Sequence, residues 1–191
     1  MLMRAWLASN SSRRKEMLEP IIPALFFKGV DADESIPEGM PILQAIDEIC
    51  SRKADAAISE EYDSIIVSDT MIIDPDDETK AIGKPDNMVH AKMILEHLRG
   101  RKHTVVTSSG LFFDGNWEFS QSTAEVLISN YSNKELEKLL ISKSWLGKAG
   151  GYDLAGEMKK FATLIEGEEA TVLGLTPEVI DGIKSHSSRL I

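Results

Sequence analysis

Short apolar runs alternate with amphipathic segments along the first part of this chain. Residues 3–8 and 24–30 are predicted to be strands, because each is a compact apolar run bounded by polar or proline positions. Between them the sequence predicts a helix over residues 12–19, which Pro20 ends. From residue 42 to residue 58 apolar side chains recur at helical spacing, which predicts a longer helix with one buried stripe.

The second part of the chain predicts a further helix, a hairpin and another helix. Residues 87–99 carry an apolar stripe with helical spacing. Residues 103–113 and 117–129 alternate well enough for two long antiparallel strands, joined by the Asp114-Gly115 turn. A helix is predicted over residues 133–141.

A final helix is predicted to begin near Pro177. Helices that alternate with strands, together with one hairpin, indicate an α/β domain with a mixed sheet.

One apolar run is followed directly by polar residues that are candidates for chemistry. Residues 64–68 predict a buried strand with the pair Asp69-Thr70 near its end. A carboxylate there is unfavourable unless it is paired, hydrogen-bonded or bound to a metal. Ligands of α/β proteins commonly bind at the ends of strands, so Asp69 is a candidate functional residue.

Composition limits the classes of protein that fit. The 191 residues suit a single domain, and no apolar stretch approaches the ~20 residues that span a bilayer. A single cysteine, Cys50, excludes an intramolecular disulfide and fits a reducing cytoplasm. The net charge of -10 and the pI near 4.9 argue against a broad nucleic-acid surface. We expect a cytoplasmic protein that binds neither nucleic acid nor a membrane.

A local group of cations stands out against this acidic background. The segment from Ser9 to Lys15 joins the first predicted strand to the first predicted helix and contains Arg13 and Arg14. Guanidinium groups and the N–H groups at the start of a helix both favour phosphate oxygens. The segment therefore predicts a site for a polyanion such as the phosphates of a nucleotide.

Acidic residues supply the complementary chemistry. Asp33-Glu34-Ser35 lies in an acidic loop, where a solvated turn is the alternative interpretation. Lys53 and Lys84, taken singly, are typical of surface charges. The chain has neither a Gly-x-x-x-x-Gly-Lys-Ser/Thr loop nor a Gly-x-Gly-x-x-Gly motif. Cations for phosphates and carboxylates for a divalent ion fit metal-assisted hydrolysis of a phosphoanhydride.

As an ordered series, these motifs resemble the Maf family of nucleoside triphosphate pyrophosphatases. The matching pieces are Leu7-Ala8-Ser9-x-Ser11-x-Arg13-Arg14, Asp33-Glu34-Ser35, Lys53-Ala54, Asp69-Thr70, Gly83-Lys84-Pro85, Gly100-Arg101-x-His103, Lys148-Ala149-Gly150-Gly151-Tyr152, Ile165-Glu166-Gly167 and Val172-x-Gly174-Leu175. The resemblance covers nearly the whole chain, so it implies one Maf-like pyrophosphatase domain over residues 1–191.

The resemblance implies an inosine-triphosphatase-like fold, which is a single elongated α/β domain with a mixed, curved sheet and a central cleft. It also implies hydrolysis of a nucleoside triphosphate to the monophosphate and pyrophosphate with a divalent cation, Mg²⁺ or Mn²⁺, and a homodimer. A nucleotide-binding regulator of cell division and septum formation with little or no turnover is the alternative.

The resemblance also assigns roles to individual residues. Asp69 would be the catalytic group that activates water, and Glu34 and Asp69 would bind the metal. The substrate-binding residues would be Ser9, Arg13, Arg14, Lys53, Thr70, Lys84 and Ala155.

One of these positions departs from the family pattern. Ala155 stands where many members have a glutamine that selects the base in the branch acting on dTTP and UTP. This departure predicts a broader substrate range or a shift toward a modified or purine base. Asp153 could instead take over the role of the glutamine, and Trp145 is a candidate stacking surface for the base.

Overall fold

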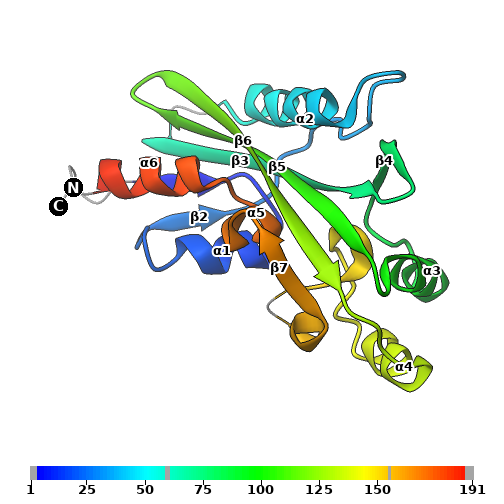
Figure 1. Cartoon of the computed structure of the whole chain (residues 1–191). Coiled ribbons are helices and arrows are strands. Elements are labelled where there is room, and N and C mark those ends of the chain that lie inside the picture. Colours follow the sequence, from blue (N-terminus) through cyan, green and yellow to red (C-terminus); the bar gives the residue numbers. More distant parts are fainter. Residues whose placement is uncertain (1–3, 59–60, 155, 188–191) are drawn as a thin grey trace. The chain divides into compact units, whose positions relative to one another are not determined.

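The computed structural model describes residues 4–58, 61–154 and 156–187, which fold into two compact units (Figure 1). The first unit holds the residues up to 69, residues 107–122 and the residues from 174 onward. The second unit holds residues 70–106 and 123–173.

Seven strands and six α-helices make up the described residues. The strands are β1 (Ala5–Leu7), β2 (Leu25–Phe27), β3 (Ser64–Asp74), β4 (Asp77–Ile82), β5 (Lys102–Phe113), β6 (Asn116–Ile128) and β7 (Ala162–Glu166). The α-helices are α1 (Ser12–Leu18), α2 (Ile42–Ala56), α3 (Met88–Leu98), α4 (Asn133–Ile141), α5 (Glu169–Leu173) and α6 (Pro177–Ser187). Two short 3₁₀ helices, η1 (Ala149–Gly151) and η2 (Glu157–Lys160), precede β7.

The strands form one mixed sheet in the order β2-β1-β3-β5-β6-β7, and β4 pairs with β3. The pairs of β1 with β2 and with β3 are parallel, whereas β3 with β4 and β6 with β7 are antiparallel. The expected α/β class with a mixed sheet is therefore confirmed.

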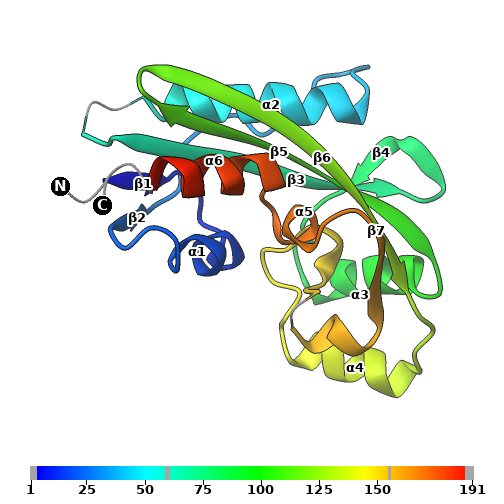
Figure 2. The same cartoon turned by 60° about the vertical axis from the view of Figure 1, so that its left-hand side comes forward.

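Helices cover both faces of the sheet in the first unit (Figures 1 and 2). Along β3, Ile65 and Val67 pack with apolar residues of α2. The residue between them, Ile66, packs with Leu18 of α1 and Val179 of α6. Side chains alternate between the two faces of a strand, so the next residues of β3 are expected to alternate between α2 and the α1/α6 side.

The second unit has a core of its own between its strands and the helices α3 and α4. Helix α4 begins with a complete capping box, in which Ser132 and Glu135 each bond the other's backbone N–H. Tyr131, next to this cap, donates a hydrogen bond of 2.7 Å from its hydroxyl to the carbonyl of Leu95 on α3. Trp145 is buried in the same core and its indole N–H donates to the carbonyl of Leu140, so a stacking role for its ring stays a prediction.

Two sequence expectations need correction. Asp69-Thr70 was expected near the end of a strand, but β3 continues through this pair to Asp74. The extension follows from the antiparallel pairing of its second half with β4, which no local pattern around Asp69 indicates. Strand β7 was not predicted at all; it depends on pairing with β6 over residues 125–128.

His103 is the buried ionisable group of the second unit with the clearest consequence for stability. Its Nε2 lies 2.8 Å from the hydroxyl of Tyr152, and its Nδ1 is buried without a hydrogen-bond partner among the described residues. Burial lowers the pKa of His103 to about 4, because the charged imidazolium is poorly solvated there.

This depressed pKa predicts acid sensitivity of the folded chain. Between pH 6.5 and 4, His103 is protonated in the unfolded chain but stays neutral in the folded chain. The free energy of unfolding therefore falls as the pH falls through this range. The variant His103→Gln has no titratable side chain at this position, so its free energy of unfolding should decline less steeply over that range. Urea denaturation at several pH values measures both slopes, and equal slopes would contradict the assignment.

Candidate active site

Ser9 lies in the turn that connects β1 to α1. Its hydroxyl oxygen accepts hydrogen bonds from the backbone N–H of Ser11 at 3.2 Å and from Nη1 of Arg14 at 3.1 Å. These two hydrogen bonds hold the backbone of the turn between Ser9 and Arg14 in place. The predicted cation-bearing segment is thus held in one conformation where β1 ends.

Arg14 points from α1 into the first unit rather than toward solvent, and the residue is only 9% exposed. Its Nε donates a hydrogen bond of 2.6 Å to the carbonyl of Gly174. Burial lowers the pKa of Arg14, and the negative charge of Asp69 opposes that effect. An arginine keeps its charge under such conditions, so a fixed positive charge lies beneath the Ser9 turn.

Lys53 is the second buried cation and lies between two carboxylates. Its Nζ is 2.7 Å from Oδ1 of Asp69 and 2.9 Å from Oε1 of Glu34. The Lys53 side chain is 7% exposed, whereas that of Glu34 is 50% exposed. A buried ammonium needs such partners. The structure therefore brings together Glu34, Lys53 and Asp69.

The loop that carries Glu34 is attached to α2 through Arg52. Nη1 of Arg52 donates to the carbonyl of Ser35 at 3.1 Å and contacts Oδ2 of Asp33 at 3.4 Å. Asp33 in turn accepts the backbone N–H of Ser35 at 2.9 Å, and this bond lowers the pKa of Asp33. Asp33 is therefore a structural residue of the loop that presents Glu34 to Lys53.

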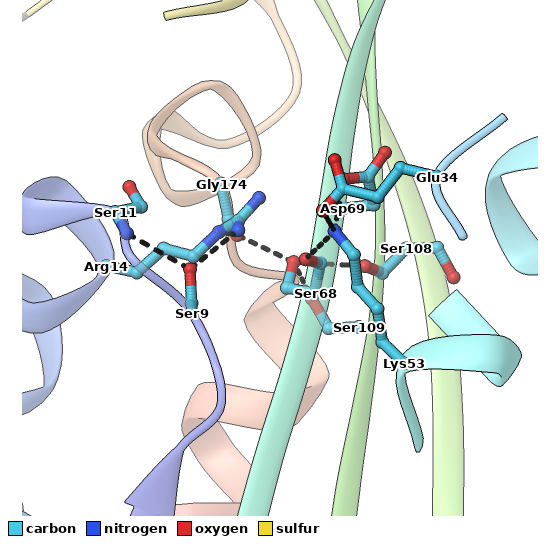
Figure 3. Close-up of polar contacts among 10 residues, drawn as sticks. All are labelled: Ser9, Ser11, Arg14, Glu34, Lys53, Ser68, Asp69, Ser108, Ser109 and Gly174. Carbon is cyan, nitrogen blue, oxygen red and sulfur yellow. Dashed lines mark hydrogen bonds and ion pairs between the residues drawn. The ribbon is translucent and has the colours of Figure 1, made fainter. Parts of the chain in front are cut away.

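The site residues form two groups on either side of β3 (Figure 3). Ser9 and Arg14 are on one side with Gly174, and Lys53 with its two carboxylates is on the other. This follows from the alternation of side chains along the strand, since Ser68 faces the first group and Asp69 faces the second. The negative charge of Asp69 also raises the pKa of Arg14, against the larger effect of burial, so the two groups influence each other electrostatically.

Sequence reasoning included Gly174 in the motif Val172-x-Gly174-Leu175 but assigned it no role in this site. Gly174 lies 160 positions from Arg14 in the chain, yet its carbonyl is the hydrogen-bond acceptor for the buried guanidinium. The Ser68 hydroxyl donates to the same carbonyl at 2.8 Å. The available signal was the group of buried polar residues within an apolar strand, Thr107-Ser108-Ser109 of β5.

The other residues predicted for substrate binding are Arg13, Thr70, Lys84 and Ala155. Arg13 is partly buried on α1 in the first unit. Thr70 and Lys84 belong to the second unit, where Lys84 is exposed, so their part in substrate binding stays a prediction. Ala155 lies outside the described residues.

The residues at Lys53 fit a divalent cation by their chemistry. Asp69 and Glu34 direct carboxylate oxygens toward one ammonium nitrogen, and such oxygens are preferred by Mg²⁺ and Mn²⁺. Among the described residues a different group of three also has metal-ligating atoms within 4.8 Å of one another, namely Asp74, Asp76 and His97 of the second unit. Arg101 already forms an ion pair with Asp76 there.

Cys50 lies one turn before Lys53 on α2 but has no nucleophilic role. Its side chain is buried, and burial raises the pKa of its thiol to about 11. A thiol reacts as a nucleophile in its thiolate form, which is scarcely populated here near neutral pH.

The chain has an α/β fold in which buried cations and the carboxylates that contact them lie around β1 and β3. Proteins of this class are suited to bind a polyanion. The sequence profile of the Maf-like protein family matches residues 4–182. The chain therefore belongs to the Maf-like family, as the ordered motifs indicated.

Relatives with assigned activities agree with this membership. A dTTP/UTP pyrophosphatase of Pyrococcus abyssi is 28% identical over 176 residues, which cover 91% of both chains. A dTTP/UTP pyrophosphatase of Chromobacterium violaceum is 28% identical over 178 residues, covering 90% of this chain and 88% of the relative.

A solved structure supports the fold alone. The HAM1 protein of Coxiella burnetii is 15% identical with a TM-score of 0.50, covering 100% of this chain and 98% of the other. Within residues 4–58, 61–154 and 156–187, no helix has both the length and the apolar character that crossing a membrane requires.

The two adjacent arginines should respond differently to substitution. Arg14→Ala leaves the buried Gly174 carbonyl and Ser9 hydroxyl without a charged donor, so the free energy of unfolding should fall by about 2 kcal/mol. Arg13→Ala, on the more exposed position of the same helix, should lower it by less than about 1 kcal/mol. Urea denaturation of both variants tests this difference, and equal losses would contradict the structural role of Arg14.

Proposed function

We propose that this chain hydrolyses a nucleoside triphosphate to the monophosphate and pyrophosphate. The observation that carries the proposal is the buried Lys53, whose Nζ is bound by Asp69 and Glu34 where β3 passes the Ser9 turn. Membership in the Maf-like family and the named pyrophosphatase relatives support the same reaction. The proposal treats residues 1–191 as one catalytic domain acting in the cytoplasm.

The cations have distinct parts in this proposal. Arg13 and the turn at Ser9 bind phosphate oxygens, and Arg14 adds positive charge from beneath. Lys53 orients the Asp69 carboxylate through a contact of 2.7 Å. A charge-assisted contact between the Arg13 guanidinium and a phosphate would contribute roughly 1.5–3 kcal/mol to substrate binding.

Asp69 acts on water in the proposed reaction. Its carboxylate accepts a proton from water as the water oxygen bonds to the α-phosphorus. The bond from that phosphorus to the bridging oxygen breaks, and pyrophosphate leaves with the electron pair. A pure binding protein gains nothing from carboxylates placed beside phosphates, which favours turnover over a regulator that only binds nucleotide.

Glu34 and Asp69 would hold the divalent cation, Mg²⁺ or Mn²⁺. When bound, the cation would neutralise part of the negative charge of the phosphates. Lys53 would then share its carboxylate partners with the cation, and Lys84 would add charge beside the phosphates.

The substrate of this chain is expected to differ from that of its named relatives. The two relatives above are dTTP/UTP pyrophosphatases, but Ala155 lacks the donor and acceptor that a glutamine offers to a pyrimidine edge. A base site without that polar partner discriminates weakly. We therefore propose a wider range of bases, or a modified or purine base.

Substitution of Asp69 tests the reaction directly. Asp69→Asn keeps the size of the side chain but removes its basicity, so kcat should fall by at least ~10²-fold while nucleotide binding persists. Pyrophosphate release from a panel of nucleoside triphosphates with Mg²⁺ is the measurement.

The exposed Asp63, which pairs with Arg4, provides the matched control, and Asp63→Asn should keep wild-type turnover. Near-wild-type kcat in Asp69→Asn would refute the role of Asp69. A wild-type chain that binds these nucleotides without releasing pyrophosphate would instead favour the regulatory alternative.

A second variant addresses the base. Wild type should discriminate among dTTP, UTP, CTP and purine triphosphates by less than ~10² in kcat/KM, and Ala155→Gln should raise the preference for dTTP and UTP. The argument is wrong if wild type already prefers these two by more than ~10² and the glutamine adds nothing.

A further inference from the structure

A chain of buried hydrogen bonds lies behind Arg14 and takes no part in the reaction just described (Figure 3). The backbone N–H of Thr176 donates to Oγ of Ser109 at 3.2 Å. The Ser109 hydroxyl donates to Oγ of Ser68 at 3.0 Å, and the Ser68 hydroxyl donates to the carbonyl of Gly174 at 2.8 Å. Ser68 and Ser109 are 1% and 0% exposed, so water does not compete for these bonds.

The direction of this chain follows from the groups at its two ends. A backbone N–H can only donate, so Oγ of Ser109 accepts from Thr176. A carbonyl oxygen can only accept, so Ser68 donates its hydrogen at the other end, and Oγ of Ser68 accepts from the Ser109 hydroxyl. Two carbonyls lie within reach of the single Ser68 hydrogen, that of Gly174 at 2.8 Å and that of Ser108 at 3.0 Å, and the shorter distance favours Gly174. Ser68, which Ser109 holds in place, is thus the second hydrogen-bond donor to the Gly174 carbonyl.

The Gly174 carbonyl is the junction between this chain and the active site. It accepts from Ser68 and from Nε of Arg14, which is 2.6 Å away. Gly174 has a φ of 109°, in the region that favours glycine. The backbone at Gly174 thus has a conformation that suits glycine, and in this conformation its carbonyl accepts from the Arg14 guanidinium.

Arg14 connects the Gly174 carbonyl to the turn at Ser9, which is the proposed phosphate-binding turn. While Nε bonds to Gly174, Nη1 donates to the hydroxyl of Ser9, which also accepts the N–H of Ser11. Because a guanidinium is planar, fixing Nε fixes the direction of its other donors. A shift of the Gly174 carbonyl would rotate this plane and loosen the Ser9 turn.

We propose that Ser68 and Ser109 are positioning residues for substrate. They hold the Gly174 carbonyl, and through it the Arg14 guanidinium, in the orientation that prepares the Ser9 turn for a triphosphate. This inference rests on the proposed function and assigns roles to side chains that contact no substrate. Such preorganisation lowers the entropic cost of binding.

Removing each hydroxyl tests this role by its effect on KM. Ser68→Ala and Ser109→Ala should raise KM for a nucleoside triphosphate about 3- to 10-fold, the effect of one neutral hydrogen bond, with kcat within about twofold of wild type. The matched control is Ser64→Ala on the same strand, because Oγ of Ser64 is buried without a hydrogen-bond partner among the described residues. The proposal is overturned if the three variants have the same KM.

A double variant separates positioning through Arg14 from a general loosening of the fold. Arg14→Lys keeps the charge but removes the Nε donor, so adding Ser68→Ala to it should change KM by less than about twofold. A full, additive effect of Ser68→Ala in that background would refute transmission through Arg14.

A measurement without turnover keeps this inference distinct from the proposed function. Hydrogen exchange at Nε of Arg14, followed by ¹⁵N NMR, should be slow in wild type and in Ser64→Ala, and several-fold faster in Ser68→Ala and Ser109→Ala. Equal exchange in all four proteins refutes positioning even if the enzyme is active. Absence of pyrophosphate release by wild type refutes the proposed function, while the exchange data still decide the roles of Ser68 and Ser109.

Discussion

The first unit depends on one physical constraint: two positive charges lie in its interior and must be compensated there. A buried charge without partners is strongly unfavourable. Lys53 is compensated by the carboxylates of Asp69 and Glu34, and Arg14 by the Gly174 carbonyl and the Ser9 hydroxyl. Breaking either set would leave a charge that the apolar surroundings cannot solvate.

This constraint explains why distant segments meet at β3. The strand turns Ser68 toward Arg14 and Asp69 toward Lys53, so consecutive residues serve the two charges on opposite sides. The loop carrying Glu34 is attached to α2 by the ion pair with Lys53. The segment at Gly174 is attached to α1 by the hydrogen bond from Arg14. In the proposed function the same residues bind the phosphates and activate water, so substitutions at them should affect both stability and activity.

Local signals in the sequence were sufficient for much of this architecture. The β5–β6 hairpin and helix α4 were predicted because a turn or a cap lies within a few residues of each. The group of Ser9, Arg14, Lys53 and Asp69 was found through ordered motifs. Gly174 stands in one of these motifs, but its role as the acceptor for Arg14 could not be inferred from it, because that role arises from tertiary contact across 160 positions. The passage of β3 through Asp69 depended in the same way on pairing with β4.

In the proposed reaction, water attacks the α-phosphorus of a nucleoside triphosphate. Turnover of the wild-type chain in ¹⁸O water, followed by mass analysis of both products, measures this directly. Attack at the α-phosphorus predicts the label on the nucleoside monophosphate and unlabelled pyrophosphate. Label in the pyrophosphate, or release of orthophosphate with a nucleoside diphosphate, would contradict it.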